Sequence, residues 1–284
     1  MNASLFLQSF EIAAVVWRES FEALLIVGTL LAWSMRERGA SRATAIRWIA
    51  GGTAAGLGLA VALAVLMMSA GDYLDGDGAD MLQFVLAGTA AILMLRMVFW
   101  MRGIDRRPSG DLGGRAATHA RSGNWMGLAT LSAIAVAREG AETVVFLFGL
   151  LSSSTGWHAG MVAVSGVLGF GLAAMSFWAF KTGAAIASKK VLSRVSQILL
   201  LILGSGLTMM VVDKTISLGI LSTMTGPLWD TSWLLDDASG IGAFIAGLVG
   251  YRSRPELLPL IGLGSYWLIA SMAYVPLRDI KVHA

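Results

Sequence analysis

Two R-E-x-x-E segments interrupt apolar runs that are long enough to cross a lipid bilayer, and this combination constrains the fold more than any other feature. The first segment is Arg18-Glu19-Ser20-Phe21-Glu22, and the second is Arg138-Glu139-Gly140-Ala141-Glu142. Each places one arginine and two carboxylates at membrane depth, where a single charge costs roughly 2.5–3.5 kcal/mol to insert. We therefore expect these charges to be offset by one another, by water in a cavity or by a bound ion.

The composition indicates an integral membrane protein. Of the 284 residues, 56% are hydrophobic and 14% are charged, whereas about 25% of residues are charged in soluble domains. The net charge of +3 comes from basic residues in short loops, so we expect membrane lipid and no nucleic acid as a partner. There is no cysteine, which excludes disulfides and thiolate metal sites. No nucleophile–base constellation or phosphate loop is present, so the chain is not expected to be an enzyme.

Apolar runs of about 20 residues predict an all-α fold with seven transmembrane helices. An apolar piece at about 238–250 is too short to span and predicts a re-entrant or interfacial helix before the last span. We expect one polytopic membrane domain over residues 1–284. The predicted spans are 10–33, 48–70, 81–101, 125–151, 159–180, 192–212 and 257–276.

The distribution of lysine and arginine predicts the orientation of the chain. Fifteen of these residues lie on one side of the predicted spans, whereas the other side has only Lys214, Arg252 and Arg254. Cytoplasmic loops carry the excess of positive charge. We therefore expect a multi-pass protein of the cell inner (plasma) membrane, with its N-terminus outside and its C-terminus in the cytoplasm.

An internal repeat underlies the two motifs, because a shift of 120 residues superposes one on the other. The first repeat covers about 10–101 and the second about 125–212, and the C-terminal region is 213–284. Three spans per repeat is an odd number, so the second repeat must be inverted. Inverted 3+3 repeats are typical of transporters, which bind substrate near the bilayer midplane. A duplication without transport is the alternative.

Within each motif, the spacing places both glutamates on one face of a helix and pairs the arginine with the second glutamate at i,i+4. If the two helices cross at the repeat axis, four carboxylates converge beside two guanidinium groups. The surplus of about two negative charges favours a bound cation over a static ion-pair cluster, which remains the alternative. The predicted metal ligands are Glu19, Glu22, Glu139 and Glu142, and Arg18 and Arg138 are predicted to balance the charge.

The ligand chemistry limits which metal is expected. Carboxylate oxygens suit hard cations such as iron, manganese, magnesium or calcium. The three histidines, His119, His158 and His283, fall in predicted loops or the tail, which disfavours zinc and copper(I). Arg96 lies inside a predicted span; it either extends toward the membrane surface or balances the glutamates.

Two acidic clusters on the predicted outer side are candidates for capturing cations. The first lacks the full EF-hand pattern, and either cluster could instead consist of solvated turns with helix-capping aspartates. The clusters are Asp72, Asp75, Asp77 and Asp80, and Asp230, Asp236 and Asp237.

Paired R-E-x-x-E motifs on the first and fourth of seven spans resemble those of the iron permease family. This family contains fungal high-affinity permeases, which work beside a multicopper oxidase, and bacterial iron uptake permeases. The resemblance covers essentially the whole chain, including 227–233 and 247–252. It implies that the motif glutamates bind iron, which is cargo rather than a cofactor, and that any oxidase or periplasmic iron-delivery partner is a separate chain. The first motif has Ser20-Phe21 where Gly-Leu is commoner.

The sequence therefore predicts a permease that imports iron ions. A transporter of another divalent cation, such as lead or manganese, is one alternative, since some relatives are associated with lead. A membrane di-iron redox protein is another, although the Glu-x-x-His motif of such sites is absent. A non-transporting sensor or assembly protein is the third. Homo-oligomerisation, the iron oxidation state and the energy source stay open.

Overall fold

The computed structural model describes residues 3–35, 40–73, 77–104, 125–151, 159–183 and 189–272. Within these ranges the chain forms eight helices and no strand, so the predicted all-helical class is confirmed. The helices are α1 (Ala3–Ser34), α2 (Ala40–Tyr73), α3 (Asp77–Ile104), α5 (Trp125–Leu151), α6 (Ala159–Lys181), α7 (Lys189–Ser217), α8 (Gly240–Val249) and α9 (Leu257–Met272).

Helix length and apolarity agree with a membrane protein. α2, α3, α6 and α7 contain stretches that are long and apolar enough to cross a bilayer. α1 and α5, with 32 and 27 residues, exceed the length of about 20 residues that a span needs, but charged motifs interrupt their apolar runs. The 16 residues of α9 form a shorter apolar helix, which covers the described part of the predicted span 257–276. The 10 residues of α8 correspond to the predicted short helix.

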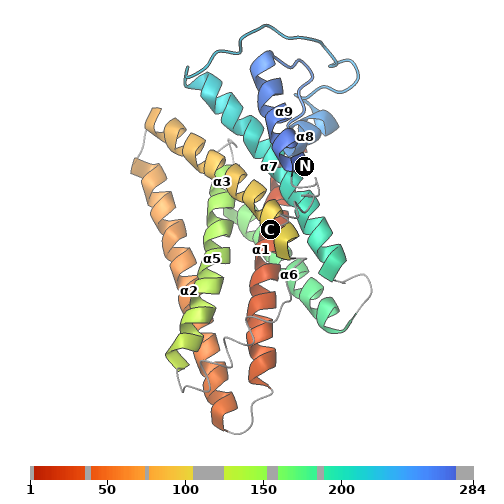
Figure 1. Cartoon of the computed structure of the whole chain (residues 1–284). Coiled ribbons are helices and arrows are strands. Elements are labelled where there is room, and N and C mark those ends of the chain that lie inside the picture. The colour runs from red at the N-terminus through yellow and green to blue at the C-terminus, as the bar shows by residue number, and fades with distance from the viewer. Residues whose placement is uncertain are drawn as a thin grey trace, which may run out of the picture.

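The two ends of the molecule are distinct in Figure 1. The start of α1, the end of α7, α8 and the start of α9 lie at the upper end, whereas α1 ends and α2 begins at the lower end. α1 and α5 run in opposite directions between these ends. We refer to the upper end as the outer end, because the sequence predicts that the N-terminus is outside.

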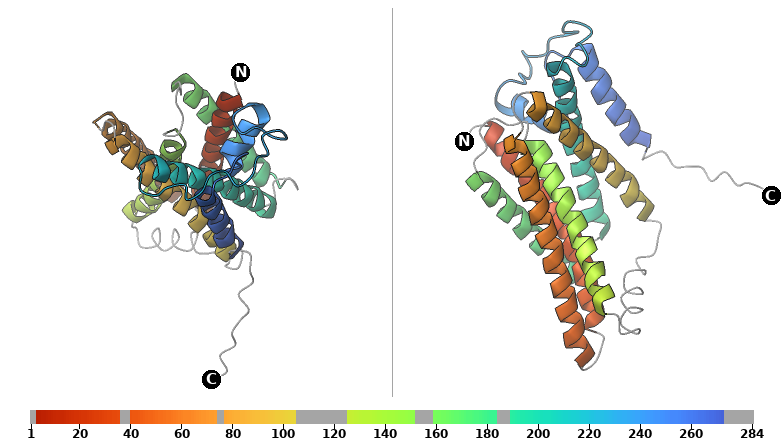
Figure 2. Two further views of the ribbon diagram at one scale, coloured as in Figure 1. Left: turned by 90° about the horizontal axis from the view of Figure 1, so that it is seen from above. Right: turned by 90° about the vertical axis from the view of Figure 1, so that its left-hand side faces the viewer.

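Helices from the two predicted repeats pack crosswise. The four most extensive contacts are α2 with α5, α1 with α6, α3 with α7 and α1 with α5. The right-hand view of Figure 2 shows α2 and α5 side by side along most of their lengths. If each helix of the first predicted repeat is exchanged for its counterpart in the second (α1 with α5, α2 with α6 and α3 with α7), the same four pairs of helices result. The C-terminal helices α8 and α9 pack on α7.

Two glycines allow equivalent pairs of helices to approach closely. A Cβ atom added at Gly56 of α2 would lie 2.7 Å from the carbonyl oxygen of Ala133 in α5. A Cβ atom added at Gly169 of α6 would lie 2.5 Å from the carbonyl oxygen of Ala13 in α1. The shift of 120 residues that superposes the two motifs also relates Ala13 to Ala133. Small residues at such crossings let helix backbones meet in a membrane.

Substituting either glycine is expected to destabilise the protein. Gly56→Ala and Gly169→Ala each push a methyl group against backbone that cannot move alone, at a cost of about 1–3 kcal/mol. The matched controls Gly58→Ala and Gly171→Ala lie on the same helices, where an added Cβ meets nothing within 4 Å. Thermal unfolding of the purified proteins measures the effect. Equal melting temperatures for test and control variants would contradict this packing.

Candidate metal centre

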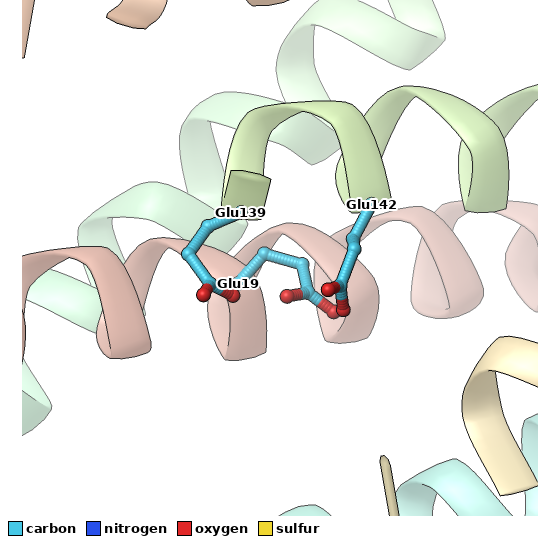
Figure 3. A group of neighbouring side chains, drawn as sticks. All are labelled: Glu19, Glu139 and Glu142. Atoms are coloured by element: carbon cyan, nitrogen blue, oxygen red, sulfur yellow. The ribbon is translucent and has the colours of Figure 1, made fainter. Parts of the chain in front are cut away.

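The two R-E-x-x-E motifs meet where α1 and α5 pack together. Figure 3 shows Glu19 of α1 and Glu139 and Glu142 of α5 pointing toward one another. One carboxylate oxygen from each lies within 4.8 Å of the others. Ligands on opposite sides of a hard divalent cation are about 4–5 Å apart. These three glutamates, which we call the carboxylate triad, therefore have a spacing that a single metal ion can bridge.

The fourth predicted ligand, Glu22, is adjacent to the carboxylate triad but is not part of it. Its Oε1 accepts a hydrogen bond of 3.0 Å from Nη2 of Arg18, which is the expected i,i+4 ion pair. Glu22 lies one helical turn beyond Glu19 on α1. The structure thus brings three of the four predicted ligands together and leaves Glu22 paired with an arginine.

Arg18 is enclosed by the protein. Its side chain is only 3% exposed and forms ion pairs with Glu19 and Glu22. Its Nε also donates a hydrogen bond of 3.0 Å to Oγ of Ser196 in α7. Every one of these partners is an oxygen, so Arg18 is held in place by charge-assisted hydrogen bonds, which are the strong class.

Arg138, the equivalent residue of the second motif, is 44% exposed. Its Nε donates to Oε1 of Glu142 at 3.0 Å and lies 3.9 Å from Oε1 of Glu139. Its Nη2 contacts the sulfur of Met97 at 3.9 Å. Arg96, which the sequence left unassigned, is exposed on α3 and forms no ion pair with the described residues. The arginines of the two motifs therefore lie in different environments.

Two oxygens of the carboxylate triad have no hydrogen-bond partner among the described residues. They are Oε2 of Glu19 and Oε2 of Glu139, and both atoms are buried. The two residues are 1% and 3% exposed. A buried acceptor without a partner costs about 1–3 kcal/mol, and more if it is charged. A cation bound to these oxygens would relieve this cost, and the all-oxygen donors match a hard cation.

The predicted outer cluster around Asp230 organises the segment between α7 and α9. Asp230 accepts hydrogen bonds from the amide (2.9 Å) and hydroxyl (2.6 Å) of Ser232, and from Nε of Arg254 (3.0 Å). The hydroxyl and amide of Ser232, together with the charge of Arg254, lower the pKa of Asp230. Asp237 accepts from the amide and hydroxyl of Ser253 at 3.1 and 2.5 Å. Both aspartates therefore have structural partners, and cation capture by them stays a prediction.

The other described aspartates of the outer clusters also have protein partners. Asp236 accepts hydrogen bonds from the amide of Ala238 and the hydroxyl of Ser239. Asp80 forms an ion pair of 2.6 Å with Lys214 of α7. The remaining predicted groups lie outside the described side chains: Asp72, Asp75, Asp77, His119, His158 and His283.

The sequence pattern did not single out two buried polar residues near the motifs. Ser196, which binds Arg18, is one of several polar residues at the start of an otherwise apolar span. Glu11 is 8% exposed and lies on α1 two helical turns before the first motif. An ionisable residue inside a predicted span is a signal that could have identified Glu11.

Comparison with known proteins gives relatives over nearly the whole chain. The family described as "Iron permease FTR1 family" matches residues 9–278. A protein named "Ferrous iron permease EfeU" from Yersinia pestis is 26% identical over 246 residues, covering 86% of this chain and 85% of that protein. The protein of the same name from Escherichia coli O6:H1 is 26% identical over 269 residues, covering 92% and 93%. No solved structure matches the chain.

Proposed function

Because the chain belongs to the iron permease FTR1 family, we propose that it imports iron across the cytoplasmic membrane through the carboxylate triad of Glu19, Glu139 and Glu142. The observation that carries this proposal is the approach of three carboxylates from two helices to within 4.8 Å of one another. Family membership and the long apolar helices indicate a multi-pass membrane permease, which supports transport rather than catalysis. The proposal adds the site and the direction of transport.

Ferrous iron is the proposed substrate. The relatives are named ferrous iron permeases, and a site with only oxygen ligands suits Fe²⁺ without selecting it strongly over Mn²⁺. The four motif glutamates, when ionised, exceed the two motif arginines by two negative charges, so one divalent cation balances the charge of the cluster. Glu22 is proposed to join the ligands during the transport cycle, when it exchanges Arg18 for the metal. A separate oxidase or iron-delivery protein stays a prediction.

Transport by this site requires access from both sides of the membrane in turn. We propose an inverted repeat, in which α1–α3 and α5–α7 rock against each other around the carboxylate triad, with α9 as a seventh span. The crosswise packing of the helices supports this symmetry, as do the close contacts that Gly56 and Gly169 make with the repeat-related residues Ala133 and Ala13. The proposed orientation has the N-terminus outside and the C-terminus in the cytoplasm.

Uptake of radioactive Fe²⁺ into liposomes containing the purified protein tests the proposed function. We expect saturable uptake that excess Mn²⁺ reduces, because Fe²⁺ and Mn²⁺ both accept oxygen ligands. Liposomes without protein provide the control for leakage. Uptake of Pb²⁺ or Mn²⁺ in the absence of iron uptake would assign the protein to another metal. Absence of flux for every metal would favour a sensor.

A further inference from the structure

A cavity of about 620 Å³ lies at the outer end of the molecule, between α1, α5, α7 and α8. It is separate from the carboxylate triad, none of whose members line it. Its polar lining is concentrated on the first turns of α1 and the end of α7. The lining residues used below are Gln8, Glu11, Asp213, Lys214 and Arg252.

Glu11 is a buried carboxylate in this cavity and has no partner among the residues that the structure describes. It is 8% exposed and forms no ion pair or hydrogen bond with any side chain that the structure describes. One turn away, Oε1 of Gln8 is also buried without a hydrogen-bond partner in the described part of the chain. Two oxygen acceptors therefore line the same cavity, and nothing in the described protein satisfies them.

The cations that line the cavity do not neutralise Glu11, because each already has an acidic partner. Arg252 forms an ion pair with Asp213. Lys214 forms an ion pair of 2.6 Å with Asp80. The two pairs are neutral overall, so the carboxylate of Glu11 supplies an excess negative charge when ionised. A buried carboxylate without a counter-charge is unfavourable, and a cation in the cavity would relieve this cost.

One apolar layer separates the cavity from the carboxylate triad. Glu11 lies eight residues before Glu19 on α1, a rise of about 12 Å along the helix axis. Between these levels are Val15 of α1 and Phe146 of α5, which are buried and belong to the same hydrophobic cluster. Since α1 and α5 run in opposite directions, the cavity, the apolar layer and the triad follow one another from the outer end inward.

The second repeat has no equivalent of this polar pair. The shift of 120 residues relates Gln8 to Leu128 and Glu11 to Leu131. Leu128 is fully buried in a hydrophobic cluster with residues of α1 and α2, and Leu131 packs against that cluster. The opposite end is therefore filled with apolar side chains where the outer end has a polar cavity. The two repeats therefore differ at these positions, and only the first places an acidic side chain there to attract a cation.

We propose that the cavity is a second metal site, at which the carboxylate of Glu11 and the amide oxygen of Gln8 hold a hydrated divalent cation. The ion binds at this site first. It then moves past Val15 and Phe146 to the carboxylate triad when the repeats move. The site's role in uptake rests on the proposed function of the carboxylate triad, but its binding of a cation can be measured separately.

Binding of Mn²⁺ to the purified full-length protein, followed by electron paramagnetic resonance, tests this site. We expect two bound ions in the unmodified protein, one in Glu11→Gln, one in Glu139→Gln and none in the double variant. Gln8→Leu removes the second oxygen and is expected to weaken the same ion that Glu11→Gln removes. Glu256→Gln is the matched control, because Glu256 is at the same end of the molecule but does not line the cavity.

The possible results separate the two metal sites. Two bound ions in Glu11→Gln, or a single ion in the unmodified protein that Glu139→Gln removes, would overturn the outer site and leave the proposed function intact. A single ion that only Glu11→Gln removes would support the outer site and count against the triad.

At iron concentrations below KM, Glu11→Gln is expected to slow uptake about tenfold through loss of electrostatic attraction. An unchanged rate there would contradict its place on the uptake route.

Discussion

Glu139→Gln is expected to abolish iron uptake, by more than about 100-fold, while the amount of inserted protein stays the same. Even residues that only orient metal ligands change affinity or activity by about 10–100-fold, and Glu139 is proposed to be a ligand. Glutamine keeps the size of the side chain but removes its charge. A neutral side chain is cheaper to insert into the membrane, so the loss would not come from failed insertion. We expect the same result for Glu19→Gln and Glu142→Gln.

Initial rates of Fe²⁺ uptake into liposomes, normalised to reconstituted protein, measure this effect. Glu256→Gln removes a glutamate outside the carboxylate triad and serves as the control for a change in net charge. Glu22→Gln gives additional information, because Glu22 is paired with Arg18 in this conformation. Loss of uptake in Glu22→Gln with retained Mn²⁺ binding would support its proposed exchange during the cycle. Normal uptake by Glu139→Gln would contradict the proposed site.

Arg18→Met is expected to reduce the yield of folded protein strongly, whereas Arg138→Met is expected to have a small effect. Removing Arg18 leaves Glu19 and Glu22 without their counter-charge in a buried place, which costs about 3–5 kcal/mol. Arg138 is 44% exposed, so its ion pairs with Glu139 and Glu142 are less enclosed by protein than those of Arg18, and we expect their loss to cost less. The two substitutions are chemically identical and differ only in burial.

The measurement is the yield of monodisperse protein after size-exclusion chromatography, together with its melting temperature. Combining Arg18→Met with Glu22→Gln removes one stranded carboxylate and is expected to recover part of the stability. Similar losses for Arg18→Met and Arg138→Met would show that the environments of the two arginines are equivalent, against the structure.

The sequence was sufficient to predict the helices, because apolar runs bounded by charged loops determine where membrane spans lie. The predicted span 125–151 has the same bounds as α5, Trp125–Leu151. The first helix begins earlier than the predicted residue 10, at Ala3. Polar residues such as Gln8 end the apolar run but not the helix, because helix formation depends on backbone hydrogen bonds. The family that the paired motifs indicated is confirmed.

The site was predictable only in part. Spacing alone predicts that Arg18 pairs with Glu22, and this ion pair is present at 3.0 Å. Spacing does not determine which glutamates meet across two helices, because that depends on how α1 and α5 cross. It also cannot distinguish the two motifs, because the arginine and the two glutamates have the same spacing in both. One part of their difference is the hydrogen bond that Arg18 donates to Ser196 of α7, in a distant part of the chain.

Anomalous X-ray diffraction from crystals of the protein grown with Mn²⁺ would locate the bound metal. We expect a metal peak between α1 and α5, bound by an oxygen of Glu19 together with an oxygen of Glu139 or Glu142. A peak bound by the glutamates of only one helix, or no peak at this position in protein that transports iron, would contradict the proposed site.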